Sequence, residues 1–349
     1  MTSNGGGSRP LSRAAEPWHA GAAVPPRCLV CHSPDASLVY RLPRFSVYAC
    51  CACGQVYLHP LPSEAEIREL FSRLYTGGEG IMPELRDYYG FCFDDRPDNP
   101  LVQLYEAWLG ALERHRPPGR LLDIGCGTGL FLAVAQRRGW TAVGIDESVE
   151  ATRHAVERFG CDVRVGDFET LDIRERFDAV TMWDIIEHAR RPVDLLAAVR
   201  RALAADGVLA LATPNQHNLI GLLGGIIYRV SARRVTAPLE RLYIDQHFLY
   251  FTPETLAQTL ARAGFAVAEI GLEATDLRRL TLSPVVRLGL RALFRVARWT
   301  ALDNRLFAIA RPADGLPADP LRSGDTSDKS FSVTFRQKGV HGRSWRLCP

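Results

Sequence analysis

The sequence lacks a long hydrophobic run and a marked excess of charge of either sign. No segment of the 349 residues reaches the ~18 consecutive apolar residues that a membrane-spanning helix needs. Forty-two Lys and Arg against 39 Asp and Glu give a formal net charge of +3, so the overall charge requires neither a nucleic acid nor an anionic surface as a partner. The 47% hydrophobic composition is typical of a globular chain.

An apolar secretory segment and internal repeats are also missing. Residues 1–26 are rich in Gly, Ser, Pro and Ala, and residues 313–349 lose hydrophobic periodicity, so we predict a disordered leader and a disordered tail. Nine cysteines in a chain without export features are more typical of thiols or metal ligands than of disulfides. We therefore expect a cytoplasmic protein.

Four of the cysteines stand in two CxxC pairs, Cys28 with Cys31 and Cys50 with Cys53. Two thiolates at this spacing can face one tetrahedral metal, and two such pairs complete a four-sulfur zinc shell with no open position. The alternating residues Ser37 to Tyr48 fit a hairpin between the pairs. We predict a small zinc ribbon over residues 27–61 whose zinc is structural, with Cys51 surplus to the site.

Residues 62–118 show helical patterns and form a predicted helical connector that could act as a lid. Ser63 is a plausible N-cap for a helix whose apolar face holds Ile67, Leu70 and Leu74. A second helix is expected around Leu101 to Arg114, before the break at Pro117-Pro118-Gly119.

From Arg120 onward, strand and helix patterns alternate at the spacing of βαβ units, which predicts an α/β fold with a parallel sheet. The expected strands are Leu121–Ile124, Ala142–Ile145, Val163–Val165, Ala179–Met182 and Val208–Ala212. Ligands of such sheets bind at the carboxyl ends of the strands, so the polar residues at these ends are the candidate binding residues.

Three successive strand ends carry groups suited to a nucleoside. The first holds Asp123 and a glycine run, Gly125, Gly127 and Gly129, which lets the backbone turn tightly beside a ligand. The second ends in Asp146-Glu147, a carboxylate suited to ribose hydroxyls, and the third is followed by Asp167-Phe168, suited to an adenine amino group and ring. The GxGxxG pattern of nicotinamide-binding domains is absent, since Leu130 stands at its third glycine.

The motifs LLDIGCGTG, VGIDES, GDFETL, FDAVTMWDIIEH and ALAADGVLALATPN resemble those of class I S-adenosylmethionine-dependent methyltransferases, from about Arg120 to Pro312. The CxxC…CxxCG segment followed by QVYLHPLPSEAEI is similar to a zinc-ribbon-bearing branch related to ubiquinone-biosynthesis O-methyltransferases. The resemblance implies a Rossmann-like seven-stranded sheet in a domain over residues 119–312, with insertions at 215–250 and 274–302. It also implies an antiparallel seventh strand beside the sixth, which Phe265–Leu272 and Arg305–Ala310 fit.

The resemblance further implies roles for single residues in binding S-adenosylmethionine. Asp123 would order the methionine amino group, and the loop Gly125-Cys126-Gly127 with Gly129 would hold the methionine end. Asp146, with Glu147, would bind ribose, and Asp167, with Phe168, would meet adenine. Trp183 is expected either to line the cofactor pocket or to fill the core.

The fourth strand ends in Trp183-Asp184-Ile185-Ile186-Glu187-His188, where an acceptor should meet the methyl group. His188 titrates near neutral pH and is the predicted general base, with Glu187 or Asp184 as its orienting partner, although positioning alone can suffice for methyl transfer. His217 and His247 are secondary candidates.

The sequence favours a small-molecule acceptor, with an oxygen as the preferred atom. Two alternatives stay open: an rRNA base methyltransferase that reads RNA with its zinc ribbon, and a non-catalytic zinc-ribbon adaptor. A nucleic acid is disfavoured because no Asn/Asp-Pro-Pro-Tyr/Phe run follows the fourth strand and the ribbon's basic and aromatic residues are few.

Two segments suggest contact with lipid. Asn218 to Val230 is apolar and glycine-rich, and the helix expected over Val286–Trp299 has a stripe of arginines at 287, 291, 295 and 298. Such a helix can lie on an anionic membrane or cover the sheet with a solvated arginine face. Peripheral membrane contact and the oligomeric state therefore stay open.

Overall fold

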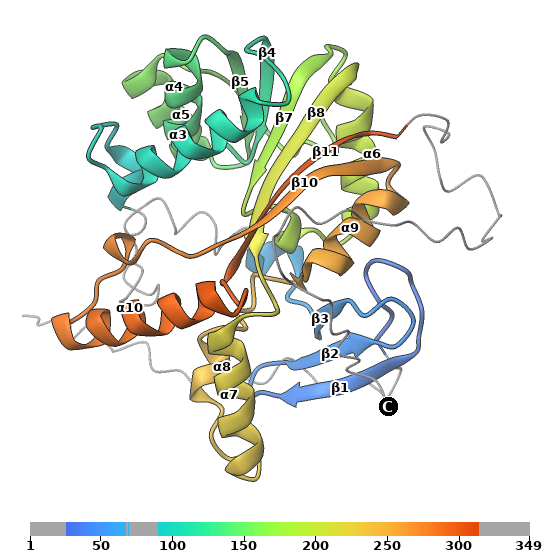
Figure 1. Cartoon of the computed structure of the whole chain (residues 1–349). Coiled ribbons are helices and arrows are strands. Elements are labelled where there is room, and N and C mark those ends of the chain that lie inside the picture. The colour runs from blue at the N-terminus through green and yellow to red at the C-terminus, as the bar shows by residue number, and fades with distance from the viewer. Residues whose placement is uncertain (1–25, 68, 70–89, 314–349) are drawn as a thin grey trace, which may run out of the picture.

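The computed structural model describes residues 26–67, 69 and 90–313 (Figure 1). A seven-stranded sheet of order β10-β11-β8-β7-β4-β5-β6 forms its centre. Its strands are β4 Arg120–Ile124, β5 Thr141–Asp146, β6 Asp162–Val165, β7 Phe177–Trp183, β8 Leu203–Pro214, β10 Phe265–Glu273 and β11 Arg305–Pro312. Only β11 runs antiparallel to its neighbours, between β8 and β10. The predicted α/β fold with seven strands and an antiparallel seventh is confirmed.

The inner strands are buried on both faces because their side chains alternate between two cores. In β11, Leu306 and Ala308 belong to one apolar cluster, and Phe307 and Ile309 belong to the other. This explains the continuous apolar runs of the sequence, which are typical of parallel sheets covered on both sides.

Helices cover both faces of this sheet (Figure 1). On one face lie α3 Pro100–Glu113, α4 Leu130–Arg137 and α5 Val149–Phe159, and on the other lie α6 Pro192–Ala202 and α9 Pro253–Arg262. Capping side chains fix several starts: Asn99 accepts from the Leu101 amide before α3, and Ser148 accepts from the Ala151 amide before α5. The cap predicted at Ser63 is present, since its Oγ accepts from the Glu66 amide at 3.3 Å and its own amide donates to Glu66 Oε2. Leu70 and Leu74 lie outside the described residues.

The four-cysteine segment folds as a small antiparallel sheet of order β1-β2-β3-β9. The first two strands, β1 Ala36–Arg41 and β2 Ser46–Cys50, form the predicted hairpin, and β3 Val56–His59 follows. The fourth strand, β9 Leu249–Tyr250, comes from the insertion at 215–250 and pairs with β3. The ribbon predicted over residues 27–61 shares its sheet and its apolar core with this insertion.

The shared core joins the ribbon to α7 Leu219–Val230 and the short α8 Ala237–Glu240. Tyr40 of β1 meets Tyr228 of α7 edge-on, with ring centroids 5.3 Å apart, and the Tyr228 hydroxyl accepts from the Arg41 amide. The ribbon therefore holds α7 in place.

The second insertion contains the 3-10 turn η4 Leu277–Arg279 and α10 Pro284–Trp299, which extends along the edge of the molecule near α7 (Figure 1). Two further 3-10 turns, η2 Phe91–Phe93 and η3 Ile186–His188, border the carboxyl ends of the strands. Among the residues that the structure describes, no helix is long and apolar enough to span a bilayer.

Candidate functional site

A cavity of 1480 Å³ opens at the carboxyl ends of β4, β5 and β7, bordered by both insertions. This exceeds the roughly 300–1,000 Å³ of an ordinary small-molecule site, so the cavity has room for a cofactor and an acceptor together. Most of the predicted cofactor residues line it, namely Asp123, Gly125, Cys126, Gly127, Asp146, Glu147, Asp167, Phe168 and Trp183.

The glycine loop needs its glycines for both conformation and space. Gly125 and Gly127 have φ values of +75° and +50°, in the left-handed region that other residues avoid. A Cβ on Gly125 would lie 2.1 Å from Ile185 Cδ1 of the loop after β7. The loop therefore passes directly beneath the segment that carries the predicted base.

Asp146 fixes this loop through both of its carboxylate oxygens. Oδ2 accepts from the Gly127 amide and Oδ1 accepts from the Ser148 amide, each at 2.8 Å. Burial raises the pKa of Asp146, and the two amide bonds oppose that shift. Because each carboxylate oxygen has two lone pairs, this geometry still allows Asp146 to accept from ribose hydroxyls.

Asp123 is the most deeply buried of the three strand-end carboxylates predicted to bind the cofactor, Asp123, Asp146 and Asp167. It is 1% exposed, and Thr181 donates to its Oδ1 at 2.6 Å. Burial, opposed by this hydrogen bond and reinforced by the charge of Asp146, raises the pKa of Asp123 to about 8. No cation pairs with Asp123 among the described residues, so an ammonium group of a ligand fits this end of the cavity.

The other residues predicted to bind the cofactor differ in what their side chains do. Glu147 is exposed, and Asp167 accepts from the Glu169 amide at 2.9 Å. Phe168 and Cys126 are buried in the two apolar cores, and the Cys126 sulfur lies over Gly144, so its side chain packs rather than binds. Gly129 is absent from the described cavity wall and instead forms the N-cap of α4, at φ +81°.

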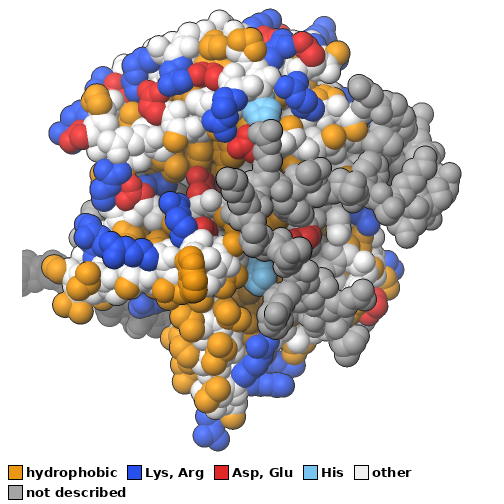
Figure 2. All heavy atoms as spheres, viewed as in Figure 1, with side chains coloured by type: hydrophobic (Ala, Val, Ile, Leu, Met, Phe, Trp, Pro, Cys, Tyr) orange, Lys and Arg blue, Asp and Glu red, His pale blue; other side chains and the backbone are white. Residues whose placement is uncertain are grey.

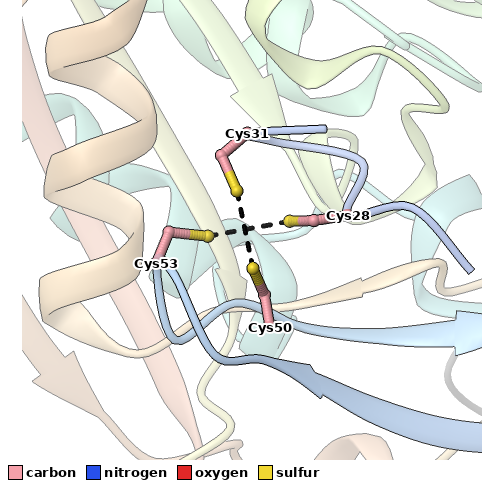
Figure 3. Close-up of side chains that lie close together, drawn as sticks. All are labelled: Cys28, Cys31, Cys50 and Cys53. Atoms are coloured by element: carbon pink, nitrogen blue, oxygen red, sulfur yellow. Dashed lines mark hydrogen bonds between the residues drawn. The ribbon is translucent and has the colours of Figure 1, made fainter. Parts of the chain in front are cut away.

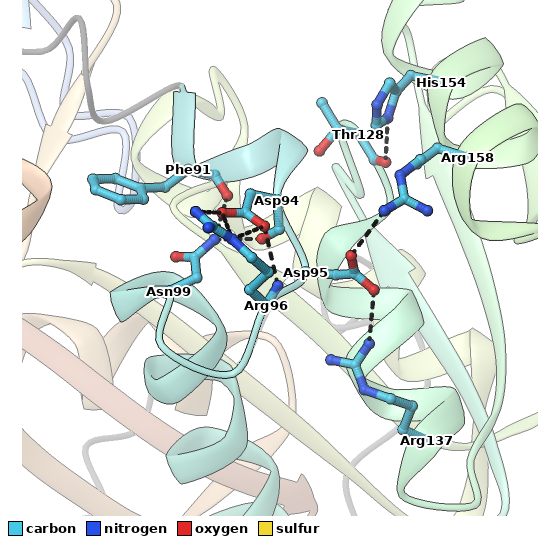
Figure 4. A network of polar contacts seen from close by, with 9 residues as sticks. All are labelled: Phe91, Asp94, Asp95, Arg96, Asn99, Thr128, Arg137, His154 and Arg158. Carbon is cyan, nitrogen blue, oxygen red and sulfur yellow. Dashed lines mark hydrogen bonds and ion pairs between the residues drawn. The ribbon is translucent and has the colours of Figure 1, made fainter.

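Residues 90–99 adjoin the cavity, whose wall they enter through Cys92, and polar contacts hold them in place (Figure 4). Asp95 bridges Arg137 of α4 and Arg158 of α5, at 3.5 and 3.1 Å. The Thr128 hydroxyl, in the glycine loop, donates to the Cys92 carbonyl, which ties the wall to the cofactor side. This part of the predicted connector is thus anchored on α4, α5 and the glycine loop.

A second part of the cavity, called the aromatic half below, is lined by aromatic side chains, namely Tyr105, Trp108, Phe131 and Trp183. Trp183 stacks on Trp108 with ring centroids 4.4 Å apart, and Phe131 meets it edge-on. Trp183 therefore lines the cavity and fills the core at once. Its Nε1 is buried without a hydrogen-bond partner in the described structure, so it could donate to a ligand.

A buried ion pair also lies on the cavity wall. Arg305 of β11 is 7% exposed and donates to Asp184 Oδ1 at 2.8 Å. Asp184 has a φ of +56°, which turns its side chain toward β11 at the end of β7. Asp184 thus pairs with Arg305, and its charge also acts on His188, for which it was one of the two predicted partners.

His188 lies on the cavity wall with His247 beside it, their ring centroids 4.8 Å apart. His188 Nδ1 lies 2.6 Å from the Gln246 carbonyl, which only accepts, so Nδ1 carries the hydrogen and Nε2 is the basic nitrogen of the neutral ring. Burial lowers the pKa of His188, so the ring is neutral near pH 7. The Gln246 carbonyl orients the His188 ring together with Asp184, whose backbone and charge also act on it; Asp184 was one of the two expected partners, with Glu187 as the other.

Glu187 is completely buried and is absent from the described cavity wall. Thr213 donates to its Oε2 at 2.9 Å, while Oε1 has no hydrogen-bond partner among the described groups, and burial raises its pKa to about 8. Glu187, His188 and His247 offer three ligand atoms within 4.8 Å of one another, a set that could hold a divalent cation. Coordination by Nε2 and proton acceptance by Nε2 exclude each other.

The four predicted metal ligands lie together at the start of the ribbon, with sulfurs pointing at a common centre (Figure 3). The sulfurs of Cys28 and Cys53 are 3.6 Å apart and those of Cys31 and Cys50 are 3.4 Å apart. A zinc tetrahedron with Zn–S bonds of about 2.3 Å has S···S edges of about 3.8 Å, so the cluster fits one zinc ion. Cys51 is not part of this cluster.

Two of the ribbon's three aromatic residues considered for RNA stacking have no free face. Tyr40 and Phe45 are buried in the core shared with α7, and Arg44 forms an ion pair with Asp245 at 2.6 Å. Tyr48 is half-buried and stacks on Tyr57, with ring centroids 6.2 Å apart.

Sequence reasoning missed Arg305 and Trp108 and ranked His247 second. Arg305 is a charge at the start of an apolar strand, which hinted at a buried role, but its pairing with Asp184 spans 121 positions of the chain. His247 reaches His188 because the Phe248 amide donates to the Glu187 carbonyl at 2.7 Å.

Residues 101–270, just under half of the chain, match the family described as a methyltransferase domain. The ubiquinone biosynthesis O-methyltransferase of Nitrobacter winogradskyi is 32% identical over 155 residues, which are 43% of this chain and 58% of that protein. The protein of the same name from Rhodopseudomonas palustris strain BisB5 is 33% identical over 155 residues, 43% of this chain and 59% of that one.

The chain thus spans less than two thirds of the length of these relatives. Among solved structures, a SAM dependent methyltransferase from Archaeoglobus fulgidus has a TM-score of 0.43 at 20% identity, covering 64% of this chain and 99% of that chain. Residues 101–270 are thus similar to the methyltransferase domain family, and the seven-stranded sheet that contains them is completed by β11 outside this match.

Proposed function

We propose that this protein is an S-adenosylmethionine-dependent methyltransferase that methylates an oxygen of a small, largely apolar acceptor. The observation that carries the proposal is the buried carboxylate of Asp123, which faces a cavity lined by two further strand-end carboxylates, Asp146 and Asp167. The family match of residues 101–270 supports the reaction, and the names of the relatives support oxygen as the acceptor atom.

Each carboxylate has a role that its position allows. Asp123 binds the ammonium group, which neutralises a charge that burial otherwise disfavours. Asp146 accepts from ribose hydroxyls while it holds the glycine loop, and Asp167 accepts from the adenine amino group. When bound, the cofactor supplies an electrophilic methyl group on a sulfonium.

The acceptor lies in the aromatic half of the cavity, against Trp183, Tyr105 and Phe294. His188 accepts the hydroxyl proton at Nε2, and the Gln246 carbonyl holds the ring in the required tautomer. The apolar wall excludes water and positions the acceptor oxygen, which is the larger part of what an in-line displacement needs. These residues suit a ring or chain that is mainly apolar and carries one hydroxyl.

We also propose that Cys28, Cys31, Cys50 and Cys53 hold a structural zinc ion. The spacing of their sulfurs fits a tetrahedral ion, and four protein ligands leave no position for a reacting group. The hydrogen bond between Cys28 and Cys53 lowers the pKa of Cys28 and raises the pKa of Cys53, so one of these two sulfurs holds a proton that a zinc ion would displace.

The first test is calorimetric titration of the zinc-replete protein with S-adenosylhomocysteine, with NADH in parallel. We expect saturable binding of the former only, weakened at least tenfold in Asp146→Ala. Absence of binding to the folded protein would contradict the proposed reaction. A positive result justifies a screen of apolar phenols and alcohols for methyl transfer.

A further inference from the structure

The two helices that border the cavity turn an apolar face away from it. In α10, Leu290 and Phe294 line the cavity, and Ala297 is the helix's only buried residue. Val285, Leu288 and Trp299 point outward and are 82%, 69% and 86% exposed. They recur with Ala292 and Val296 at intervals of three and four residues, so they form one stripe along the outer side of the helix.

The helix α7 repeats this arrangement. Its small residues Gly224 and Gly225 pack against α8 and the ribbon, where a Cβ on Gly225 would lie 2.5 Å from the Tyr40 hydroxyl. Five apolar side chains on the other side are 41–83% exposed, namely Leu222, Leu223, Ile226, Ile227 and Val230. Figure 2 shows these hydrophobic side chains over the projecting end of the molecule, with basic side chains at its tip.

The charges around these stripes are all of one sign. Residues 218–239 contain three arginines and no acidic residue, and residues 277–302 contain six arginines and no acidic residue. The whole chain has 42 basic and 39 acidic residues, so this is a local concentration. On α10, Arg291, Arg295 and Arg298 flank the outer apolar stripe, and Figure 2 shows basic side chains along this helix.

We propose that α7 and α10 together form a surface, the α7/α10 surface (Leu219–Val230 and Pro284–Trp299), that docks on an anionic lipid bilayer. Exposed Leu, Ile, Val and Trp side chains enter the acyl boundary, and the flanking arginines meet lipid phosphates. A cover helix with a solvated arginine face does not account for the outer stripe of α10, which packs on nothing in the described structure.

A bilayer fits this surface better than a second copy of the chain. A two-fold contact would place the same arginines opposite each other, with no acidic residue in either segment to pair with them. An anionic bilayer supplies both the apolar layer and the opposite charge.

The position of the α7/α10 surface bears on where the methyl acceptor enters the cavity. This step rests on the proposed function. Both helices also line the cavity, through Ile220 and Gly221 of α7 and Leu290 and Phe294 of α10. An acceptor dissolved in the bilayer can therefore reach the aromatic half of the cavity between the two helices. This assigns the acceptor to the membrane-soluble compounds.

The test is sedimentation of the zinc-replete full chain with vesicles of phosphatidylcholine alone and of phosphatidylcholine mixed with phosphatidylglycerol. We expect binding to the anionic vesicles that weakens as salt is added. The charge variant Arg291→Glu with Arg295→Glu should lose about fivefold in partitioning for each arginine removed. The apolar variants, Leu288→Glu with Trp299→Glu and Ile226→Glu with Ile227→Glu, should each lose at least tenfold.

Val156→Glu is the matched control, because Val156 of α5 is 51% exposed on another face. It should bind vesicles like the unaltered protein. All variants should keep their S-adenosylhomocysteine affinity, which shows that they fold. The proposal would be overturned if the unaltered protein did not bind anionic vesicles, or if the charge and apolar variants bound them equally well. It would also be overturned if light scattering showed a dimer that these variants abolish. Vesicle binding without cofactor binding would retain the surface and remove the proposed reaction.

Discussion

The buried carboxylate of Asp123 makes cofactor binding sensitive to pH. Its pKa of about 8, raised by burial, means that the free protein holds Asp123 protonated at pH 6. An ammonium ligand requires the carboxylate, so binding below pH 8 releases a proton. We therefore predict that the affinity for S-adenosylhomocysteine rises by up to about tenfold per pH unit from pH 6 toward pH 8 and then levels off. Calorimetric titration across this range measures it.

Asp123→Asn is the control for this prediction. The amide retains a hydrogen-bond acceptor for Thr181 but cannot carry a charge, so the variant should bind more weakly and with little dependence on pH. A pH slope that persists in the variant would assign the titration to another group.

His188 is expected to affect turnover rather than cofactor binding. Its Nε2 is the basic nitrogen, so His188→Ala should reduce kcat by about 10²–10⁴-fold while the affinity for S-adenosylhomocysteine stays within about twofold. Steady-state kinetics on an accepted phenol provides the measurement. His217→Ala is the matched control, because His217 is exposed and is not on the described cavity wall.

An unchanged kcat in His188→Ala would mean that positioning alone drives the transfer. A loss of activity with chelator that Mg²⁺ or Mn²⁺ restores would instead assign Glu187, His188 and His247 to a cation.

The local sequence was sufficient to predict those site residues whose position depends on a single strand end. Asp123 and Asp146 lie at the carboxyl ends of β4 and β5, Asp167 follows β6, and parallel strands bring these ends to one edge. The Gln246 carbonyl and Arg305 lie 58 and 121 positions from the groups they bind, so no local pattern predicted them. Glu187 and Asp184 were the carboxylates expected beside His188; Glu187 has a carboxylate oxygen within 4.8 Å of a His188 ring nitrogen but accepts its hydrogen bond from Thr213, and the charge of Asp184 acts on His188.

At the level of elements, the close contact between α7 and the ribbon depends on Gly225. A methyl group at this position meets the Tyr40 hydroxyl at 2.5 Å, so Gly225→Ala should displace α7 and reduce the free energy of unfolding by about 1–3 kcal/mol. Urea denaturation followed by circular dichroism measures this change.

Gly289→Ala in α10 is the control, since an added Cβ there meets nothing within 4 Å. It should raise stability by up to about 1 kcal/mol, because alanine favours a helix more than glycine does. Equal stability of the two variants would show that the α7 contact contributes nothing.

The strands of the central sheet were predictable because each has a dense apolar run, whereas β9 was not. This strand has two residues, Leu249 and Tyr250, and becomes a strand only because β3 offers it a free edge. For the same reason the sequence separated the ribbon from the insertion, although the structure joins them in one sheet and one core.

On the scale of the whole molecule, the sheet and core that the ribbon shares with the insertion link the zinc site to the surface around the cavity. The cysteines fix the ends of β2 and the turn before β3, β3 pairs with β9, and the segment before β9 carries Gln246 and His247 to His188. The same ribbon holds α7 through the shared core. Loss of zinc should therefore disturb the acceptor side of the cavity before the glycine loop, which belongs to the central sheet.

We predict that Cys50→Ser, or removal of zinc by a chelator, lowers the melting temperature by several degrees and the affinity for anionic vesicles by at least tenfold. The affinity for S-adenosylhomocysteine should fall much less, because Asp123, Asp146 and the glycine loop lie outside the core that the ribbon shares with α7. Zinc content, differential scanning calorimetry and vesicle sedimentation measure these effects. Cys92→Ser, a cysteine outside the cluster, should keep its zinc and its vesicle binding. If zinc-free protein retained vesicle binding, the ribbon would not be what positions α7.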